Sequence, residues 1–214
     1  MITITAFAWV PGFAQGHVKD LRVRWALEEA GLPYQTRLLR QGDQDTPEYR
    51  ALQPFGQVPV LQQDGLTLFE SGAIVLHIGE RSEALLPRDP AARARAIQYV
   101  FAALNSIEPH TAALAAVEVF HADQPWAPLR RPSLEAFARG RLTGLAKALG
   151  RKPFLDGDQF TVGDLIMATV LRDLGDRPVL AEHSNLVDYV ARCAGRPAFI
   201  RALNAQLADF RRAA

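Results

Sequence analysis

Residues that could bind a small anionic peptide follow one another closely in the first half of the sequence. Two apolar runs, Val58–Leu61 and Leu66–Phe69, surround an Asp-Gly turn, and this pattern predicts a β-hairpin. Pro59 cannot donate a hydrogen bond to a strand ladder, so the backbone groups of Val58 are predicted to stay open to another partner. Ser71 is predicted to cap a helix whose N-terminal N–H groups favour an anion. Together these features predict a receptor for a small peptide with a carboxylate.

The elements that must position these residues alternate between strand and helix. The segments predicted to form strands are 2–7, 34–39, 58–61 and 66–69. Those predicted to form helices are 20–30, a short helix that Thr46-Pro47 opens and that ends before Pro54, and 71–79. Asp20 is expected to cap the first of these helices, and Gly31 is expected to end it. The order predicts an α/β domain whose last hairpin pairs antiparallel.

The second half of the sequence is predicted to be helical throughout. Residues 81–90 contain two prolines and no clear period, which is typical of a linker. Helices are predicted at 91–121, 134–149, 165–171, 185–194 and 197–210. Thr161 and Asp164 have the spacing of a capping box in front of the third of these helices. The predicted organisation is an α/β domain at 1–80, a linker at 81–90 and an all-α domain at 91–214.

The binding stretch resembles the glutathione-binding half of the cytosolic glutathione transferase family. The family's pattern is a proline-phenylalanine-glycine turn, then valine and a cis-proline, then a Glu-Ser pair at the start of a helix. The matching residues are Pro54-Phe55-Gly56, Val58-Pro59 and Glu70-Ser71, at the family's spacing. The family also carries a capping box like that of Thr161 and Asp164. The resemblance therefore covers the whole chain and implies a thioredoxin-like N-terminal domain followed by an all-helical C-terminal domain.

The resemblance implies that glutathione is the co-substrate, and it assigns roles to four residues. In the family, the valine backbone before the cis-proline pairs with the cysteinyl unit of glutathione, and Val58 and Pro59 match these positions. Glu70 and Ser71 match the residues that hold the γ-glutamyl amino and carboxylate groups. Ser71 alone has another interpretation, because serine caps many helices that bind nothing.

The glycyl carboxylate of glutathione needs a polar or basic group. Gln44 matches the position where some classes of the family place a histidine, and Gln57 matches one where some place a lysine. Both side chains are neutral, so the site would use hydrogen bonds or the charge of Arg40. The alternative is that all three are solvated loop residues.

In the family, a hydroxyl or cysteine between the first strand and the first helix activates the glutathione thiol, but the matching loop at residues 8–19 contains no Ser, Thr, Tyr or Cys. A thiolate is the effective nucleophile, so the site must lower the thiol pKa. His17, when protonated, or Lys19 could do so by charge, and Gln15 or the backbone N–H groups at the helix start could do so by hydrogen bonding. Phe7, where some classes have a tyrosine, cannot donate. The alternative for His17 is an exposed loop residue without a catalytic role.

Apolar residues near this loop suggest a hydrophobic co-substrate. Trp9, Val10 and Phe13 could form one wall of its pocket, with Val117 of a long helix opposite. Packing between domains or subunits is the competing interpretation. Phe55 matches a position where some classes insert an aromatic ring into a partner subunit, so a homodimer is expected.

The composition limits the partners, metals and covalent links that are expected for this protein. The 24 basic and 23 acidic residues nearly balance, so neither nucleic acid nor a membrane is expected as a partner. A single cysteine, Cys193, excludes an intramolecular disulfide. The five histidines lack metal-ligand spacing, so no metal is expected. With neither a signal peptide nor an apolar run long enough to span a bilayer, a cytoplasmic protein is expected.

These observations favour a glutathione transferase that conjugates the glutathione thiolate to a small hydrophobic electrophile. Peroxidase or isomerase chemistry on the same thiolate fits the site equally well. The alternative from a different class is a glutathione-binding or protein-interaction module with little catalysis, which the hydroxyl-free loop favours. A glutathione-linked reductase is a weaker possibility, because it normally has a cysteine in that loop.

Overall fold

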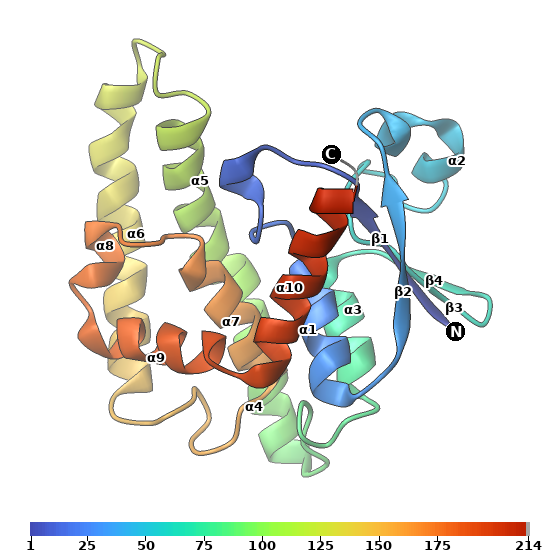
Figure 1. Cartoon of the computed structure of the whole chain (residues 1–214). Helices are drawn as coiled ribbons and strands as arrows, with labels where there is room; N and C mark the ends of the chain where they lie inside the picture. Colours follow the sequence, from blue (N-terminus) through green and yellow to red (C-terminus); the bar gives the residue numbers. More distant parts are fainter. Residues whose placement is uncertain (213–214) are drawn as a thin grey trace. The chain divides into compact units, whose positions relative to one another are not determined.

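The computed structural model describes residues 1–212, which form two compact units (Figure 1). The first unit contains Met1–Leu86 and the segment from Gly195 onward, and the second is Pro87–Ala194. The last helix, α10 (Pro197–Arg212), packs against α1 (Asp20–Ala30) and so groups with the first unit. These units differ from the sequence-based domains in the placement of that helix.

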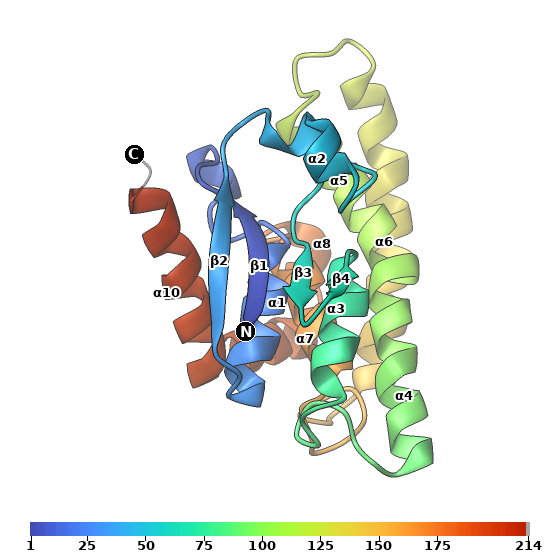
Figure 2. The same cartoon turned by 90° about the vertical axis from the view of Figure 1, so that its right-hand side faces the viewer.

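The first unit is built on a four-stranded mixed sheet in the order β2-β1-β3-β4 (Figure 2). The strands are β1 (Ile2–Phe7), β2 (Tyr34–Leu39), β3 (Leu61–Gln63) and β4 (Leu66–Leu68). β1 and β2 are parallel, which requires a crossover, and α1 supplies it. β3 runs antiparallel to both β1 and β4. The thioredoxin-like arrangement predicted from the sequence is confirmed.

The hairpin forms at the predicted turn, but its first strand is shorter than predicted. Asp64 and Gly65 connect β3 to β4 with φ values of 50° and 84°, the positive values that a tight two-residue hairpin turn requires. Residues 58–60 lie outside β3, which begins at Leu61. The prediction of a strand over 58–61 was therefore wrong for its first three residues, where Pro59 lacks the N–H needed to extend a ladder.

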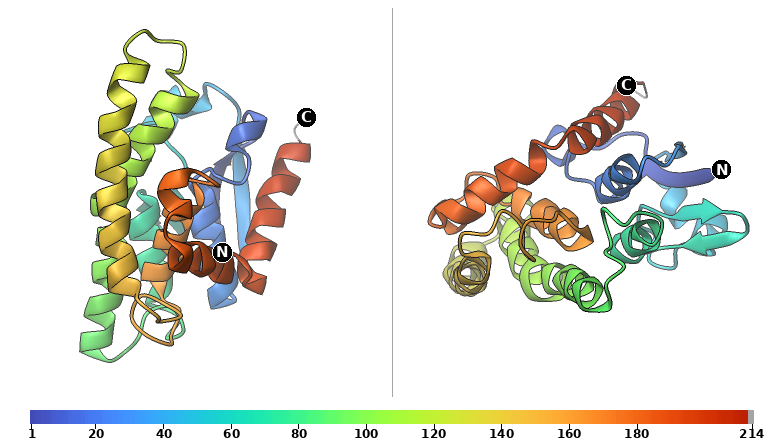
Figure 3. Two further views of the ribbon diagram at one scale, coloured as in Figure 1. Left: turned by 90° about the vertical axis from the view of Figure 1, so that its left-hand side faces the viewer. Right: turned by 90° about the horizontal axis from the view of Figure 1, so that it is seen from below.

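Helices α1, α2 (Pro47–Arg50), α3 (Ser71–Gly79) and α10 complete the first unit, together with short 3₁₀ turns at Gly12–Ala14 and Asp43–Asp45. α1 contacts both α3 and α10 and lies between them (Figure 3). Gly31 ends α1 at φ 65°, as predicted. Asp20 does not cap α1, contrary to prediction. Lys19 occupies the N-cap position, and Asp20 is the first helical residue, with its carboxylate bonded to Arg24 one turn along.

The second unit is helical. Its elements are α4 (Pro90–Phe101), a π-helical segment η3 (Ala102–Ile107), α5 (Glu108–Val119), α6 (Ala127–Leu149), α7 (Val162–Arg172), α8 (Pro178–Ala181) and α9 (Ser184–Ala194). The single helix predicted over 91–121 is interrupted by η3. Pro109 explains the interruption, because it lacks an N–H and its ring clashes with the carbonyl four residues earlier.

α7 lies at the centre of the second unit. Most of its residues are buried, and it contacts α4 and α9. Gly163 permits the close approach to α4, because a Cβ there would lie 2.7 Å from the Cβ of Tyr99 and 2.9 Å from the carbonyl oxygen of Ala96. In residues 1–212, no helix combines the length and the apolar character needed to span a membrane.

Candidate functional site

Hydrogen bonds engage backbone groups of Gln57 and Val60 on either side of Val58, whereas, among the described residues, none engages the backbone of Val58 itself. Tyr49 donates its hydroxyl to the carbonyl of Gln57 at 2.7 Å, which uses its only proton. The Thr5 hydroxyl accepts from the Val60 N–H at 2.8 Å, and the Thr5 N–H bonds the Val60 carbonyl at 2.9 Å. Within residues 1–212, no hydrogen bond engages the backbone N–H or C=O of Val58, which is only 7% exposed. Nearly all such buried groups in proteins have partners, so this pair is a candidate for bonding a ligand.

The side chain of Val58 belongs to a small apolar cluster that also contacts the loop at 8–19. The cluster contains Leu39, Tyr49, Val58 and Val60, and Val18 of the loop packs against it. The peptide bond between Val58 and Pro59 is cis. Val18 directly follows His17, so this contact ties the segment around His17 to the cluster that contains Val58.

The N-terminus of α3 is the second part of the site, and among the described residues no side chain caps it. Glu70, not Ser71, is the N-cap residue, so the predicted capping role of Ser71 was wrong by one position. Glu70 has φ 67° and ψ 113°, a strained conformation for a residue other than glycine, and its side chain makes no capping bond. Ser71 is the first helical residue and is buried. The first N–H groups of α3 therefore lack a side-chain cap.

Arg22 joins α1 to this helix start. Its guanidinium Nη1 donates to the Ser71 hydroxyl oxygen at 3.3 Å, and Arg22 is only 3% exposed. Because the hydroxyl oxygen accepts from Arg22, the hydroxyl proton can point to an anion in front of α3. Sequence reasoning missed Arg22, because a charged residue within a predicted helix is usually solvated and only the packing of α1 on α3 reveals its partner.

The three residues predicted for the glycyl end differ in how they are held. The Gln44 amide accepts from the Gly42 N–H at 2.9 Å and donates to Asp45 at 3.2 Å, so it braces its own loop. The Arg40 side chain is exposed, while its backbone N–H bonds Asp43 at 2.8 Å. Gln57 is exposed, and its carbonyl is held by Tyr49. Arg40 and Gln57 are thus the two whose exposed side chains are not seen to brace their own loop.

The loop at 8–19 is tied to the end of β2. The Ala8 N–H bonds the Leu39 carbonyl at 2.7 Å, and the side chain of Gln41 donates to the Trp9 carbonyl at 3.1 Å. Trp9 and Phe13 are exposed, whereas Val10 is buried. The loop therefore presents two aromatic rings on its surface and anchors itself through a smaller residue between them.

The three candidates for thiol activation lie just before α1. His17 is exposed, and its backbone N–H bonds the Ala14 carbonyl at 3.0 Å. The Gln15 amide nitrogen reaches the Val10 carbonyl at 3.4 Å, and Lys19 is half-buried at the N-cap position. His17 is consequently the candidate with the most accessible side chain.

Val117, the fourth predicted pocket residue, lies on α5 in the second unit. It lines a cavity of about 420 Å³ between α5 and α6, together with Glu118, Ala122, Ala127, Pro128 and Arg131. The cavity wall combines apolar side chains with an ion pair, because Arg131 contacts Glu118 at 3.1 Å. In the described part of the chain, no group of three or more His, Cys, Asp or Glu side chains is arranged to hold a metal ion.

The fold and the open helix start define a thioredoxin-like protein with an added helical unit, and comparisons identify the family. The family model described as glutathione S-transferase, N-terminal domain, matches residues 21–81. The disulfide-bond oxidoreductase YfcG of Escherichia coli K12 is 30% identical over 199 residues, which cover 86% of this chain and 90% of YfcG. At this identity and coverage, the chain belongs to the glutathione S-transferase family.

Two solved structures are similar along nearly their whole length. One is a glutathione transferase family member from Pseudomonas fluorescens Pf-5, with 26% identity, a TM-score of 0.82 and coverage of 94% of this chain and 92% of that chain. The other is a glutathione transferase from Burkholderia graminis, with 27% identity, a TM-score of 0.83 and coverage of 95% and 88%. Each of those structures contains two bound glutathione molecules.

Proposed function

We propose that the chain is a glutathione transferase that conjugates the glutathione thiolate to a small hydrophobic electrophile. The observation that carries this proposal is the unpaired backbone of the buried residue Val58, in the same unit as the uncapped start of α3. The glutathione found in two similar structures supports it. Peroxidase or isomerase chemistry on the same thiolate is compatible with the same site.

In this proposal, glutathione satisfies the groups that the protein leaves open. The cysteinyl backbone pairs with the N–H and C=O of Val58 as an added strand would. The γ-glutamyl carboxylate binds the first N–H groups of α3 and the Ser71 hydroxyl, whose oxygen Arg22 holds. The carboxylate of Glu70 binds the γ-glutamyl amino group. The strained backbone of Glu70 is then a cost of placing that carboxylate.

The glycyl carboxylate is assigned to Arg40 and Gln57, because Gln44 is committed to its own loop. The exposed rings of Trp9 and Phe13 offer an apolar surface to the electrophile. The part that Val117 would play in the same pocket stays a prediction.

Thiol activation is assigned to His17, with the backbone N–H groups at the start of α1 as additional donors. A protonated imidazole stabilises the thiolate, so the thiol releases its proton to solvent near neutral pH. The sulfur then forms a bond to an electrophilic carbon. In an addition the product carbanion or enolate takes up a proton, and in a substitution a leaving group departs with its electron pair.

The test is the ultraviolet absorbance of the thiolate of bound glutathione against pH, in the wild type and in His17→Ala. The proposal predicts a bound-thiol pKa below that of free glutathione and a rise of about one unit in the variant. Lys19→Ala tests the rival candidate in the same turn, and a larger rise of the thiol pKa in Lys19→Ala than in His17→Ala would move the activating role to Lys19. Tight binding without a lowered thiol pKa would instead favour a binding module, and no binding would contradict the assignment of Val58 and α3.

A second candidate reaction is the reduction of a disulfide by glutathione. One observation favours it: the relative YfcG is named a disulfide-bond oxidoreductase. The loop at 8–19 lacks the cysteine that a glutathione-linked reductase normally has there, so glutathione would supply every thiol. A bound glutathione thiolate would attack one sulfur of the substrate disulfide and release the other as a thiolate. A second glutathione would resolve the mixed disulfide, so no protein cysteine is consumed. Turnover of a small disulfide and of an aromatic electrophile, measured side by side, distinguishes the two reactions.

We also propose a homodimer in which Phe55 contacts the partner subunit. Phe55 is 62% exposed on a tight turn, and its ring meets the exposed ring of Phe69 edge to face, with centroids 6.1 Å apart. Two aromatic rings exposed together are unusual unless something covers them. Sedimentation of the wild type and Phe55→Ala should show a dimer and a weakened dimer, respectively. A monomeric wild type would contradict the proposal.

A further inference from the structure

α10 carries a buried side chain that reaches into the loop at 8–19. Gln206 is completely buried. Its amide oxygen accepts from the Gly16 N–H at 3.1 Å, and its amide nitrogen donates to the Val18 carbonyl at 3.3 Å. His17 lies between these two residues. One side chain from the far end of the sequence therefore holds the backbone on both sides of His17.

Gln206 is itself fixed by a buried network of charges. Its amide nitrogen also donates to one Asp20 carboxylate oxygen at 2.7 Å. Arg24 donates to the other Asp20 oxygen at 2.7 Å and to Asp209 of α10 at 2.7 Å. A flipped Gln206 amide would turn its oxygen toward the Asp20 carboxylate, so only one orientation satisfies every partner.

The bonds to β2 hold the start of the loop, at Ala8 and Trp9, and Gln206 adds a long-range anchor near its other end, where the turns of the loop are local. Gly16 adopts φ 80°, a left-handed conformation at which the chain changes direction just before His17. The neighbouring turns are held by bonds such as that from the His17 N–H to the Ala14 carbonyl, three residues back. The Gln206 contacts instead connect the loop to a packed helix, and Gly16 is buried where they meet.

We propose that Gln206 is a positioning residue for thiol activation, which holds His17 and the first turn of α1 in register with the bound thiol. The inference rests on the proposed function, because the register has a chemical consequence only if a thiol is activated there. Gln206 makes no contact with the reacting atoms and acts through the backbone of Gly16 and Val18. A small displacement of an activating group can cost much of its effect on rate.

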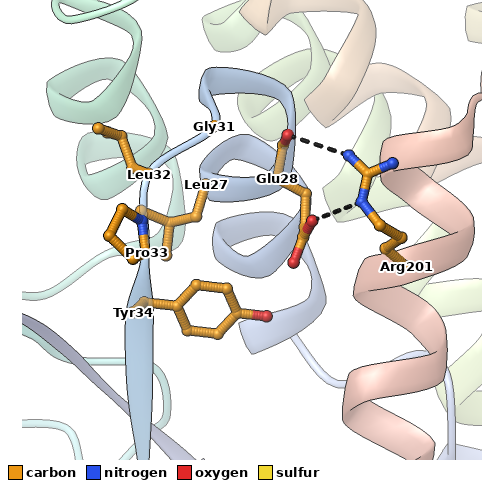
Figure 4. A pocket seen from close by; sticks show the side chains of 7 residues that line it. All are labelled: Leu27, Glu28, Gly31, Leu32, Pro33, Tyr34 and Arg201. Atoms are coloured by element: carbon orange, nitrogen blue, oxygen red, sulfur yellow. Dashed lines mark hydrogen bonds and ion pairs between the residues drawn. The ribbon is translucent and has the colours of Figure 1, made fainter.

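A residue on the same helix supplies a matched control. Arg201 of α10 donates to the Glu28 carboxylate of α1 at 2.7 Å, beside a cavity of about 400 Å³ (Figure 4). Figure 4 shows that this ion pair joins α10 to Glu28 in the C-terminal half of α1, whereas the loop at 8–19 precedes the N-terminal end of that helix. Arg201→Ala therefore weakens the attachment of α10 without removing a bond to the loop.

The experiment compares the wild type, Gln206→Met and Arg201→Ala, with bound-thiol pKa, kcat and the KM for glutathione as readouts. In Gln206→Met we expect the thiol pKa to rise by about one unit and kcat to fall about tenfold. Because the Val58 and α3 contacts are untouched, the KM for glutathione should stay within about twofold. Arg201→Ala should leave all three readouts at wild-type values even if it lowers the melting temperature.

Gln206→Glu is a second variant that tests the positioning role if Gln206→Met fails to fold. A protonated glutamic acid has one acceptor for Gly16 and one donor for Asp20, whereas the ionised form has no donor and repels that carboxylate. The variant should approach wild-type kcat at low pH and lose it as the new carboxyl ionises.

Four outcomes would count against the account. A wild-type thiol pKa and kcat in Gln206→Met, or an unchanged pH profile in Gln206→Glu, would overturn the positioning role alone. Equal losses in Arg201→Ala and Gln206→Met would also overturn it, because general weakening of α10 would then suffice. A wild type that binds glutathione without lowering its thiol pKa would contradict the proposed function itself.

Discussion

The starts of helices α7 and α3 differ in whether a side chain caps their first N–H groups. The first N–H groups of any α-helix lack intrahelical partners. At α7, the Thr161 hydroxyl accepts from the Gly163 N–H at 3.3 Å, and the Asp164 carboxylate accepts from the Thr161 N–H at 2.9 Å. The predicted capping box is therefore confirmed. At α3, the N-cap residue Glu70 is strained and makes no side-chain cap.

The difference separates a helix start that stabilises the fold from one that is available to a ligand. The partners of Asp164 are all internal and include the Leu155 N–H at 2.8 Å and the Tyr189 hydroxyl at 3.0 Å. At α3, the buried Arg22 contacts Ser71 beside the uncapped N–H groups, which makes the surroundings favourable to an anion. Changes at α7 should therefore alter stability, and changes at α3 should alter binding.

The largest effect is expected for Asp164→Ala. The change leaves several buried donors without an acceptor, so unfolding free energy should fall by about 3–5 kcal/mol. Urea denaturation measures the loss, and the exposed residue Asp158 provides the control, since Asp158→Ala should change stability by less than about 0.5 kcal/mol. The comparison fails if Asp164→Ala is as stable as the wild type.

Ser71→Ala should affect binding more than stability. Losing a hydroxyl that donates to a carboxylate costs about 1.5–3 kcal/mol, which is a rise of roughly tenfold to a hundredfold in the Kd for glutathione. Thr161→Ala is the matched change at α7. It should cost about 1–2 kcal/mol of stability and leave the Kd unchanged. Calorimetric titration measures the Kd of both variants, and thermal unfolding measures their stability. A raised Kd in Thr161→Ala, or a loss of stability without a raised Kd in Ser71→Ala, would contradict the prediction.

Glu70→Gly should gain stability and lose affinity. Glycine adopts φ 67° without steric cost, so the variant should be more stable by about 1 kcal/mol. Loss of the carboxylate should raise the Kd for glutathione about tenfold. Glu70→Gln keeps the strain and should therefore show no gain in stability. A Glu70→Gly protein that is less stable than the wild type would argue that the conformation is not strained.

The smallest expected effect is the pH dependence of stability that arises from Asp164 of α7. Burial raises the pKa of Asp164 above its ordinary value of 3.8, although hydrogen bonds from Leu155, Thr161 and Tyr189 oppose the shift. The folded state thus holds this proton more tightly than the unfolded state does. Its contribution to stability is present at acid pH and falls as pH rises from the ordinary value through the raised pKa. Urea unfolding across this range should show a smaller decline in Asp164→Asn than in the wild type, because burial also raises the pKa of Asp20 and its share of the decline remains.

Most elements could be predicted from the sequence, because their signals are local. The alternation at 2–7, the Asp64-Gly65 turn and the capping box at Thr161 each lie within a few residues of the structure that they specify. The N-caps of α1 and α3 were each misassigned by one residue. Errors in the bounds of elements arose where prolines alter a regular pattern. Pro59 shortens β3, and Pro109 introduces a π-helical segment into a continuous helical pattern.

The candidate site was only partly predictable, because half of it depends on tertiary contacts. Val58 and Glu70 could be found from a local motif. Arg22 and Gln206 could not, because their roles depend on the packing of α1 against α3 and α10. Gln206 is separated from Gly16 by almost the whole chain, and a glutamine within an amphipathic helix gives no signal of burial.

The most direct test of the central claim is an amide NMR titration of the protein with glutathione. The account predicts that the backbone N–H signals of Val58 and Gly72 shift together and saturate at one Kd, because both groups gain a ligand partner. The N–H signals of Thr161 and Gly163, which already have internal acceptors, should stay in place. Saturable binding with no change at Val58 and Gly72 would contradict the account.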